Sequence, residues 1–253
     1  MRKIFATVAT ASFVAAAVPA SAQEPDVSDV VSYLALVTTP VGALPPSLGS
    51  AMLESPSAGV GFGARYGWMD LDGSAVHNLG LGVDFVAPWS GDLGLTLGYS
   101  LPDCPDGVEC DGNFMGGASW QTKVSSMDVG TSSRVNLGVD AQLGLARSDD
   151  GAGESVTAMS VALSLPVALV TGSAGGIRIA PFVSPGFGYG RISGTDPVSG
   201  DGVSESGTRF LLGGGASLMN ASGSFAFNAG VQKVFIDQGD IQFGVGMSFH
   251  PGR

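Results

Sequence analysis

The sequence predicts an all-β protein that forms a closed antiparallel up-and-down transmembrane β-barrel of ten strands. Along ten segments, apolar residues alternate with small or polar ones, and a strand places such alternating side chains on opposite faces. Mean hydropathy is +0.31 and only 13% of the residues are charged, which is unusual for a soluble secreted protein. Yet beyond its first residues the chain has no apolar run of about 18 residues, the length that a spanning helix needs. A lipid-facing barrel combines these properties because its apolar residues occupy every second position.

Residues 1–22 have the pattern of a secretory signal peptide. Arg2 and Lys3 supply the positive start, an apolar run of small residues follows, and Ala-Ser-Ala at 20–22 matches a cleavage site. The run is too short for a membrane anchor, and no stop-transfer charges follow it. We expect cleavage, which leaves a mature chain that begins near Gln23.

Residues 23–56 form a leader before the predicted barrel. Apolar residues at i, i+3, i+4 and i+7 behind Pro25-Asp26 predict one short amphipathic helix; they are Val27, Val30, Val31 and Leu34. Regular structure then ends at Pro40, Pro45 and Pro46. Four placements of the leader stay open: in the periplasm, on the membrane surface, inside the barrel as a plug, or as a disordered tether.

The ten predicted strands fall at residues 58–69, 79–85, 93–101, 114–120, 134–145, 159–167, 177–189, 209–218, 225–232 and 241–249. With their flanks they are roughly 9–13 residues long, as tilted strands that cross a bilayer should be. The last strand carries an unbroken apolar file, Ile241, Phe243, Val245, Met247 and Phe249. If the barrel closes, this strand pairs with the first, so that no sheet edge faces lipid. Proline interrupts the sixth and seventh strands at Pro166, Pro181 and Pro185, which predicts bulges there and leaves an eight-stranded barrel as the alternative.

The connections differ in length between the two ends of the predicted barrel. With the amino terminus in the periplasm, the periplasmic connections are residues 86–92, 122–133, 171–176 and 220–223, and only the second is long. The outward connections are residues 70–77, 102–113, 148–154, 192–207 and 236–240, and two of them are long. Aromatic residues gather at the strand ends, as they do where lipid meets water: Trp68, Tyr99, Phe114 and Tyr189 towards the outer rim, and Phe85, Trp89, Trp120 and Phe249 towards the inner rim.

The export signal, the alternating strands, the aromatic strand ends and the closing strand together resemble small outer-membrane β-barrel proteins of Gram-negative-type bacteria. The resemblance covers residues 57–249 and describes a class without selecting a subfamily. It implies an outer-membrane location, outer-membrane lipids as surroundings, and recognition of the last strand by the barrel assembly machinery. We expect a monomer. In that class the closing aromatic is usually the last residue, whereas here a tail, residues 250–253, follows Phe249.

The predicted inner face carries glycines and ten polar or charged residues: Arg65, Asp84, Arg134, Asp140, Gln142, Arg178, Arg209, Asn228, Gln232 and Gln242. In the first interpretation these side chains satisfy one another as an internal polar network. In the second they line a narrow channel, which four arginines against two aspartates would bias weakly towards small anions. A ten-stranded barrel is near the size that side chains can still fill. Both interpretations stay open.

The acidic balance of the chain excludes a nucleic-acid partner. Without Arg2 and Lys3, 9 basic and 22 acidic residues remain, a net charge of −13, whereas phosphate binding needs a basic surface. The predicted outward connections hold 14 of the 22 acidic residues: Asp70, Asp72, Asp103, Asp106, Glu109, Asp111, Asp149, Asp150, Glu154, Asp196, Asp201, Glu205, Asp237 and Asp240. No segment has calcium-loop spacing, so we expect a solvated acidic face and no metal.

The two cysteines, Cys104 and Cys110, flank the turn-forming Pro105-Asp106-Gly107. In an exported protein this pair is most simply a disulfide, and its short loop predicts a stabilisation of about 2–3 kcal/mol. No histidine lies nearby to complete a metal site.

The sequence predicts neither an enzyme nor a cofactor site. The only histidines are His77 and His250. His77 shares a predicted loop with Ser74 and Asp72, but their spacing does not establish a nucleophile–base geometry. Two functions remain: a structural or surface-interaction barrel that presents acidic extracellular loops, or a small passive diffusion channel. A soluble periplasmic β-protein is the fallback.

Overall fold

The computed structural model describes residues 27–54, 59–71, 74–87, 91–103, 112–149, 155–172, 176–195, 202–236 and 241–251. The strands within them are β1 (Gly59–Leu71), β2 (Ser74–Ala87), β3 (Gly91–Pro102), β4 (Asn113–Val129), β5 (Ser133–Asp149), β6 (Ser155–Ser164), β7 (Val167–Gly172), β8 (Arg178–Thr195), β9 (Gly202–Met219), β10 (Phe225–Val234) and β11 (Ile241–Phe249). Two helices precede them, α2 (Val27–Val37) and α3 (Pro40–Ala43). The predicted signal peptide lies outside the described residues.

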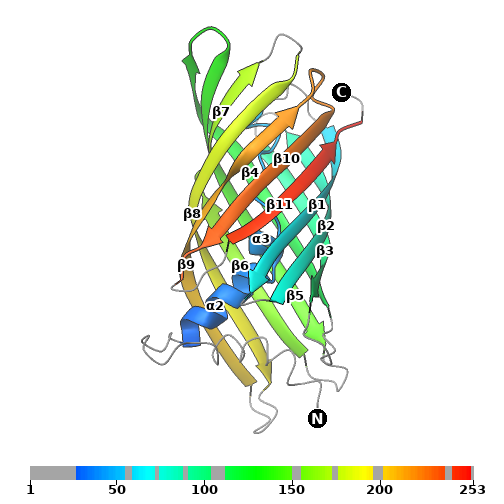
Figure 1. Ribbon diagram of the computed structural model, residues 1–253, viewed down its shortest axis with the longest axis vertical. Coiled ribbons are helices and arrows are strands. Elements are labelled where there is room, and N and C mark those ends of the chain that lie inside the picture. The colour runs from blue at the N-terminus through cyan, green and yellow to red at the C-terminus, as the bar shows by residue number, and fades with distance from the viewer. Residues whose placement is uncertain are drawn as a thin grey trace.

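The strands form one closed antiparallel barrel (Figure 1). Each strand pairs with its neighbours in sequence, and β11 closes the ring against β1, with Phe249 opposite Phe62 and Phe243 opposite Trp68. β6 and β7 are two halves of one strand, because both pair with β5 on one side and with β8 on the other. The barrel therefore has ten strands, and the predicted fold class and the pairing of the last strand with the first are confirmed.

Only one of the three strand prolines lies at a break in the strand itself. Pro166 lies in the gap between β6 and β7, whereas β8 runs unbroken through Pro181 and Pro185. Pro185 accepts a hydrogen bond from the Leu165 backbone N–H at 2.9 Å, so its nitrogen faces the same gap. Pro181 lies opposite a stretch of β7 without regular pairing. The missing proline N–H donors therefore fall where the ladder is already interrupted, and the bulges predicted within the seventh strand are wrong.

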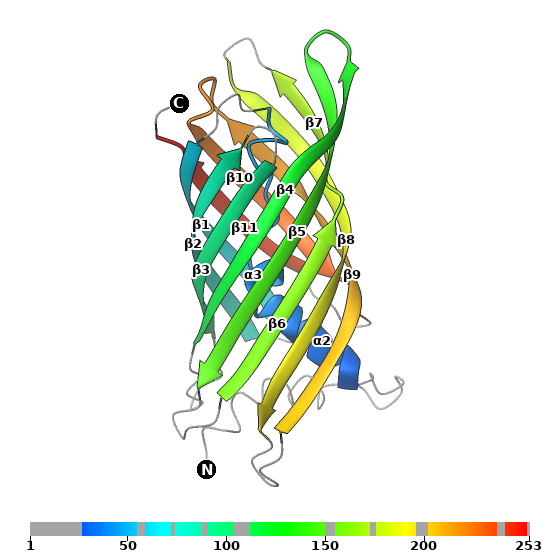
Figure 2. The ribbon, with the colours of Figure 1, turned by 180° about the vertical axis from the view of Figure 1, so that it is seen from behind.

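The barrel has one end with short turns and one with longer connections. At the turn end, β2 connects to β3, β4 to β5, β7 to β8 and β9 to β10, and β1 begins and β11 ends there. At the loop end, β1 connects to β2, β3 to β4, β5 to β6, β8 to β9 and β10 to β11. The long connection predicted at 122–133 is wrong: β4 continues to Val129 past a register shift at Lys123/Ser125, and the β4–β5 hairpin projects beyond its neighbours (Figure 2).

Several strands also extend further at the loop end than predicted. Three acidic residues expected in outward connections therefore lie on strands: Asp70 in β1, Asp149 in β5 and Glu205 in β9.

At the turn end, the tail begins as part of the barrel wall. The His250 backbone N–H donates a hydrogen bond to the Ser224 carbonyl at 2.8 Å, and His250 is only 5% exposed.

The outer wall of the barrel is apolar. Leu81 is 70% exposed and Leu97 75% exposed, and both belong to a long series of outward-facing Leu, Val, Ile and Phe side chains on every strand. The inner face carries the glycines and polar side chains instead, such as Ser160, Asn136 and Gln232, all buried. This arrangement is the inverse of a soluble barrel, whose apolar face lies inside. Of the helices in the described part of the chain, neither is long and apolar enough to cross a membrane.

Candidate functional site

The lumen of the barrel is occupied by residues 27–54, which we call the luminal plug (Figure 1). The plug comprises α2, α3 and an extended stretch that ends in a turn at 50–54. Its side chains pack in three clusters against inward-facing residues of the wall. Of the four placements that the sequence left open, the structure shows the one inside the barrel.

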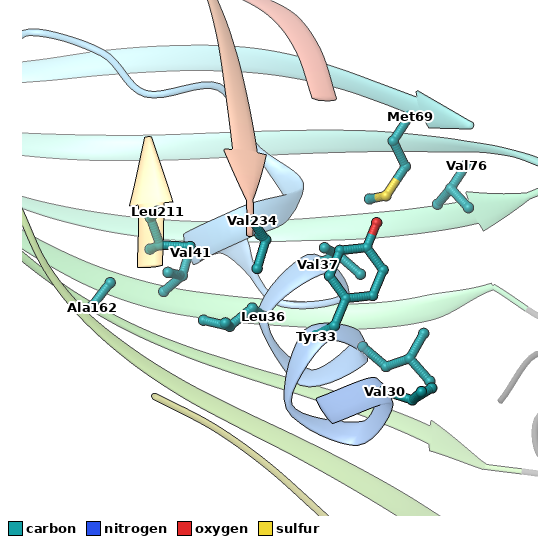
Figure 3. Packing of buried hydrophobic residues seen from close by; sticks show 11 residues of the cluster. Val30, Tyr33, Leu36, Val37, Val41, Met69, Val76, Ala162, Leu211 and Val234 are labelled. Carbon is teal, nitrogen blue, oxygen red and sulfur yellow. The ribbon is translucent and has the colours of Figure 1, made fainter. Parts of the chain in front are cut away.

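At the loop end, helix α2 packs against inward-facing residues of several strands (Figure 3). Tyr33, Leu36 and Val37 are almost fully buried, in one cluster with Met69 of β1 and Val234 of β10. The sequence predicted an amphipathic helix with one apolar face. The structure buries the other face as well, because a helix inside a barrel has no solvent side. The polar Ser32 on that face accepts a hydrogen bond from Arg209 Nε at 3.0 Å.

In the loop-end half of the barrel, glycines on the wall make room for the plug backbone. A Cβ atom at Gly67 would lie 2.1 Å from the Ala43 carbonyl oxygen, and one at Gly190 would lie 2.4 Å from the Ser32 carbonyl oxygen. Such distances are too short for any side chain, so only glycine permits this approach. Several of the luminal glycines, such as Gly67 and Gly190, are therefore contact points for the plug.

Polar side chains of the wall bond the plug backbone along its length. Gln232 Nε2 donates to the Val41 carbonyl at 3.2 Å, Gln121 Oε1 accepts from the Gly49 N–H at 2.6 Å, and Asp92 accepts from the Ala51 N–H at 2.9 Å. The hydroxyls of Thr39 and Ser160 also form a short hydrogen bond. These bonds satisfy backbone groups that a chain outside regular structure would otherwise bury unpaired.

The turn end of the plug is held by an ionic cluster around Glu54. Its carboxylate accepts hydrogen bonds from Arg134 Nη1 at 3.1 and 3.2 Å and from Lys123 Nζ at 3.3 Å. Arg178 Nη1 donates to the Glu54 carbonyl oxygen at 2.7 Å, and Asn136 Nδ2 donates to the Met52 carbonyl oxygen at 2.8 Å. Glu54 adopts φ 58°, an uncommon conformation for a residue other than glycine, so the cluster holds a strained turn in place.

Protonation of Glu54 is expected to loosen the plug in acid. Burial raises the pKa of this carboxyl, but hydrogen bonds from Arg134 and Lys123 lower it by more, so the pKa lies below its ordinary value of 4.5. The cluster therefore contributes fully above pH 4.5, and its contribution is lost as the pH falls through the lowered pKa. Channel opening in planar bilayers should rise below pH 4.5, and Glu54→Gln should open at neutral pH and lose that rise. An unchanged acid response in Glu54→Gln would assign it to another carboxyl.

A polar cavity of about 80 Å³ remains between the plug and the wall near the turn end. Its lining includes Ser47 and Ser50 from the plug and Arg65, Asp84 and His250 from the wall. Asp140 also lines it and accepts hydrogen bonds from Gln142 at 2.6 Å and Ser164 at 3.4 Å. The cavity has room for several water molecules.

The structure places all ten sequence-predicted lumen residues on the inner face, in three groups. Four bond the plug directly or through the Glu54 cluster: Arg134, Arg178, Arg209 and Gln232. Five line the cavity: Arg65, Asp84, Asp140, Gln142 and Asn228. Gln242 donates to the Met69 sulfur at 3.6 Å. Three of the four arginines proposed to attract small anions are therefore engaged with the plug.

Sequence reasoning missed the plug-binding residues at the end of β4. Gln121 and Lys123 continue the inward file of Ser119, but the register shift at Lys123/Ser125 ends the alternation there and hid the strand end. Glu54 was missed because it lies in the leader, with no strand pattern. The signal that could have indicated the plug-binding end of β4 was the polar pair Gln121 and Lys123, two positions apart just after the weakly alternating segment 114–120.

Substitution of Gly67 by alanine tests the close approach of the plug. The added methyl group would overlap the Ala43 carbonyl oxygen, and such overpacking costs about 1–3 kcal/mol. We expect Gly67→Ala to increase channel opening in planar bilayers. Gly63→Ala is the matched control on the same strand and face, because a Cβ there would lie 3.3 Å from a wall carbonyl and near no plug atom. Equal behaviour of the two variants would contradict the contact.

His77 lies on β2 with partners other than those the sequence suggested. Tyr66 Oη lies 2.6 Å from His77 Nδ1, and Asp103 Oδ2 lies 3.3 Å from His77 Nε2. The tyrosine ring also stacks on the imidazole, with ring centroids 6.0 Å apart. The histidine is thus held between a phenol and a carboxylate, and neither partner is the hydroxyl nucleophile that a serine hydrolase needs. Asp72 lies outside the described residues.

The predicted interface aromatics separate between the two ends of the barrel. Trp68, Tyr99, Phe114 and Tyr189 lie on the loop-end half, and Phe85, Trp120 and Phe249 lie on the turn-end half. Tyr99 and Phe114 pack edge to face with centroids 4.9 Å apart. Trp89 and the predicted disulfide between Cys104 and Cys110 lie outside the described residues.

No protein-family model matches this chain. A search of curated proteins likewise found no match. Among solved structures, the chain is similar to the N-terminal β-barrel domain of Pseudomonas aeruginosa OprF, with 16% identity, coverage of 76% of this chain and 98% of that chain, and a TM-score of 0.31. It is also similar to Ail of Yersinia pestis, solved with the heparin analogue sucrose octasulfate (13% identity, 76% and 96% coverage, TM-score 0.33). A third is the β domain of the Bordetella autotransporter BrkA (14% identity, 77% and 100% coverage, TM-score 0.43). These neighbours are bacterial outer-membrane β-barrel proteins, the class that the sequence resembles, and what this chain shares with them is the fold alone.

Proposed function

We propose that the protein is an integral β-barrel of a bacterial outer membrane whose lumen is closed by its own residues 27–54. In this role it is a structural or surface-interaction protein that presents an acidic face on the outside. The observation that carries the proposal is the plug: its backbone and side chains bond the wall from α2 to the Glu54 cluster. A lumen built to hold a protein segment is not built to pass solutes.

The apolar outer wall supports the membrane location. A contiguous belt of exposed Leu, Ile, Val and Phe side chains on a closed barrel would aggregate in water, whereas lipid covers it. The shorter connections lie at the same end of the barrel as the start of β1 and the end of β11. This arrangement supports a turn end that faces the periplasm and a loop end that faces outside. Export through a cleaved signal peptide is part of the same proposal.

Fractionation and bilayer recording test the proposal. The protein should require detergent for extraction, migrate differently on gels before and after heating as closed barrels do, and give no steady conductance in planar bilayers. Release without detergent would contradict the membrane location. A steady conductance from a folded, heat-modifiable preparation would contradict the closed lumen.

The alternative function is a narrow diffusion channel, and one observation favours it. A cavity near the turn end is lined in part by Arg65 and Asp140. If the plug moved, water could fill the lumen from this cavity and form a continuous path. Bilayer recordings distinguish the two functions, because a channel conducts at neutral pH without any change to the plug. Anion preference that disappears in Arg65→Ala would favour the channel.

A further inference from the structure

The luminal plug runs in one direction along the barrel axis. Ser32 contacts Arg209 and Gly190 in the loop-end half, Pro46 contacts Gly213 midway, and Glu54 bonds Arg134 beside the 130–132 turn. Two of the apolar clusters follow the same order: Val30 packs with Val76 at the start of β2, whereas Met52 and Leu53 pack with Met219 and Ala226 at the turn end. The plug therefore spans the lumen from the loop end to the turn end, where β1 begins.

This direction determines where the preceding chain enters. Because β1 starts at the turn end, a plug that began there would have to enter and return through the same mouth. Helix α2 instead begins at the loop end, with the more C-terminal plug residues nearer the turn end (Figure 1). We propose that the chain before Val27 leaves the barrel through the loop end, so that the barrel anchors its own amino-terminal end on the outer surface of the cell.

The inference rests on the proposed function for one point, the assignment of the loop end to the outside. Within the barrel it rests on packing alone. Residues 32–37 are buried, so the lumen around α2 is filled and has no room for a second strand of chain returning towards the turn end. The residues just before the helix, Gln23, Glu24 and Asp26, are polar and suit an aqueous mouth.

The consequence is an amino-terminal end that is presented at the cell surface. After cleavage of the expected signal peptide, the mature terminus near Gln23 would lie beside the connections of the loop end. The contacts of Arg209 with Ser32, and of Gly190 with the plug backbone, would hold the start of the plug at the loop end and so keep the amino terminus outside.

Three single-cysteine reporters test the topology, in a chain whose Cys104 and Cys110 are replaced by serine. One cysteine is inserted between Asp26 and Val27, one is Gly202→Cys at the loop end, where a Cβ has open space, and one is Ser132→Cys in the 130–132 turn. Intact cells are treated with a membrane-impermeant maleimide. The inserted cysteine and Gly202→Cys should be labelled, and Ser132→Cys should be labelled only after the outer membrane is permeabilised.

The outcomes separate the two proposals. If Gly202→Cys is labelled on intact cells while the inserted cysteine needs permeabilisation, the threaded plug is wrong and the membrane orientation stands. If Ser132→Cys is labelled and Gly202→Cys is protected, the orientation is wrong and the outer presentation with it. A peptide tag inserted between Asp26 and Val27 of the chain with its native cysteines gives a second readout. Antibody binding to intact cells supports the proposal, and binding only after permeabilisation overturns it.

Discussion

Deletion of residues 27–54 is expected to turn a silent barrel into a conducting one. The plug fills the lumen at the loop end with α2 and at the turn end with Met52 and Leu53, both almost fully buried. Without it, the wall glycines at the plug contacts leave open space, and the inner face is polar and wettable. Single-channel recordings of the deletion variant should show discrete conductance steps that the complete protein lacks.

The control for the deletion is a folded barrel. The deletion variant should keep its heat-dependent gel mobility, because strand pairing does not involve the plug. Addition of a synthetic peptide of residues 27–54 to the loop-end side should reduce the conductance. A deletion variant that is folded and still silent would contradict the account, since wall side chains alone would then fill the lumen.

Substitution of Glu54 by lysine is expected to release the turn end of the plug. The change replaces a carboxylate bonded by Arg134 and Lys123 with a third cation beside them. Hydrogen bonds to charged groups contribute about 1.5–3 kcal/mol each when buried, and the partly exposed partners reduce this to about 1–3 kcal/mol in total. The open fraction should rise roughly 5- to 150-fold, measured as open probability in planar bilayers.

Asp128→Lys is the matched control for the lysine substitution. Asp128 also bonds Arg134, at 2.7 Å to Nε, but it belongs to β4 and is 71% exposed. The same charge reversal at this position removes a partner of Arg134 without touching the plug. Open probability should stay near that of the unmodified protein. If the two variants open equally, the effect comes from Arg134 or the hairpin and not from the plug anchor.

The barrel could be predicted from sequence because its signal is local. Each strand shows its two faces in the alternation of a few residues, and the closing strand Ile241–Phe249 shows this without a break. The pairing of this strand with β1 follows from closure. Errors arose where the alternation stops, as at the Lys123/Ser125 register shift, or where proline suggested a break in β8 that its neighbours accommodate.

The plug could be predicted only in part because its contacts are not local. The spacing of Val27, Val30 and Val31 correctly predicts a helix, but the surroundings of that helix depend on the closed wall. Glu54 and Arg134 are 80 positions apart in the sequence, and nothing near either residue indicates the other. The glycines at 67 and 190 show that something approaches the wall closely, yet glycine does not identify what it contacts.

Disulfide formation between the plug and the wall tests the central claim most directly. The Cβ atoms of Pro46 and of a side chain at Gly213 would lie 3.3 Å apart, near the spacing of about 3.5–4.5 Å that a disulfide requires. In a chain with Cys104 and Cys110 replaced by serine, Pro46→Cys with Gly213→Cys should form a disulfide in the membrane. Pro46→Cys with Gly202→Cys, at the far loop end, should not. Failure of the first pair to cross-link in a folded barrel, or equal cross-linking of both pairs, would contradict a plug held inside the lumen.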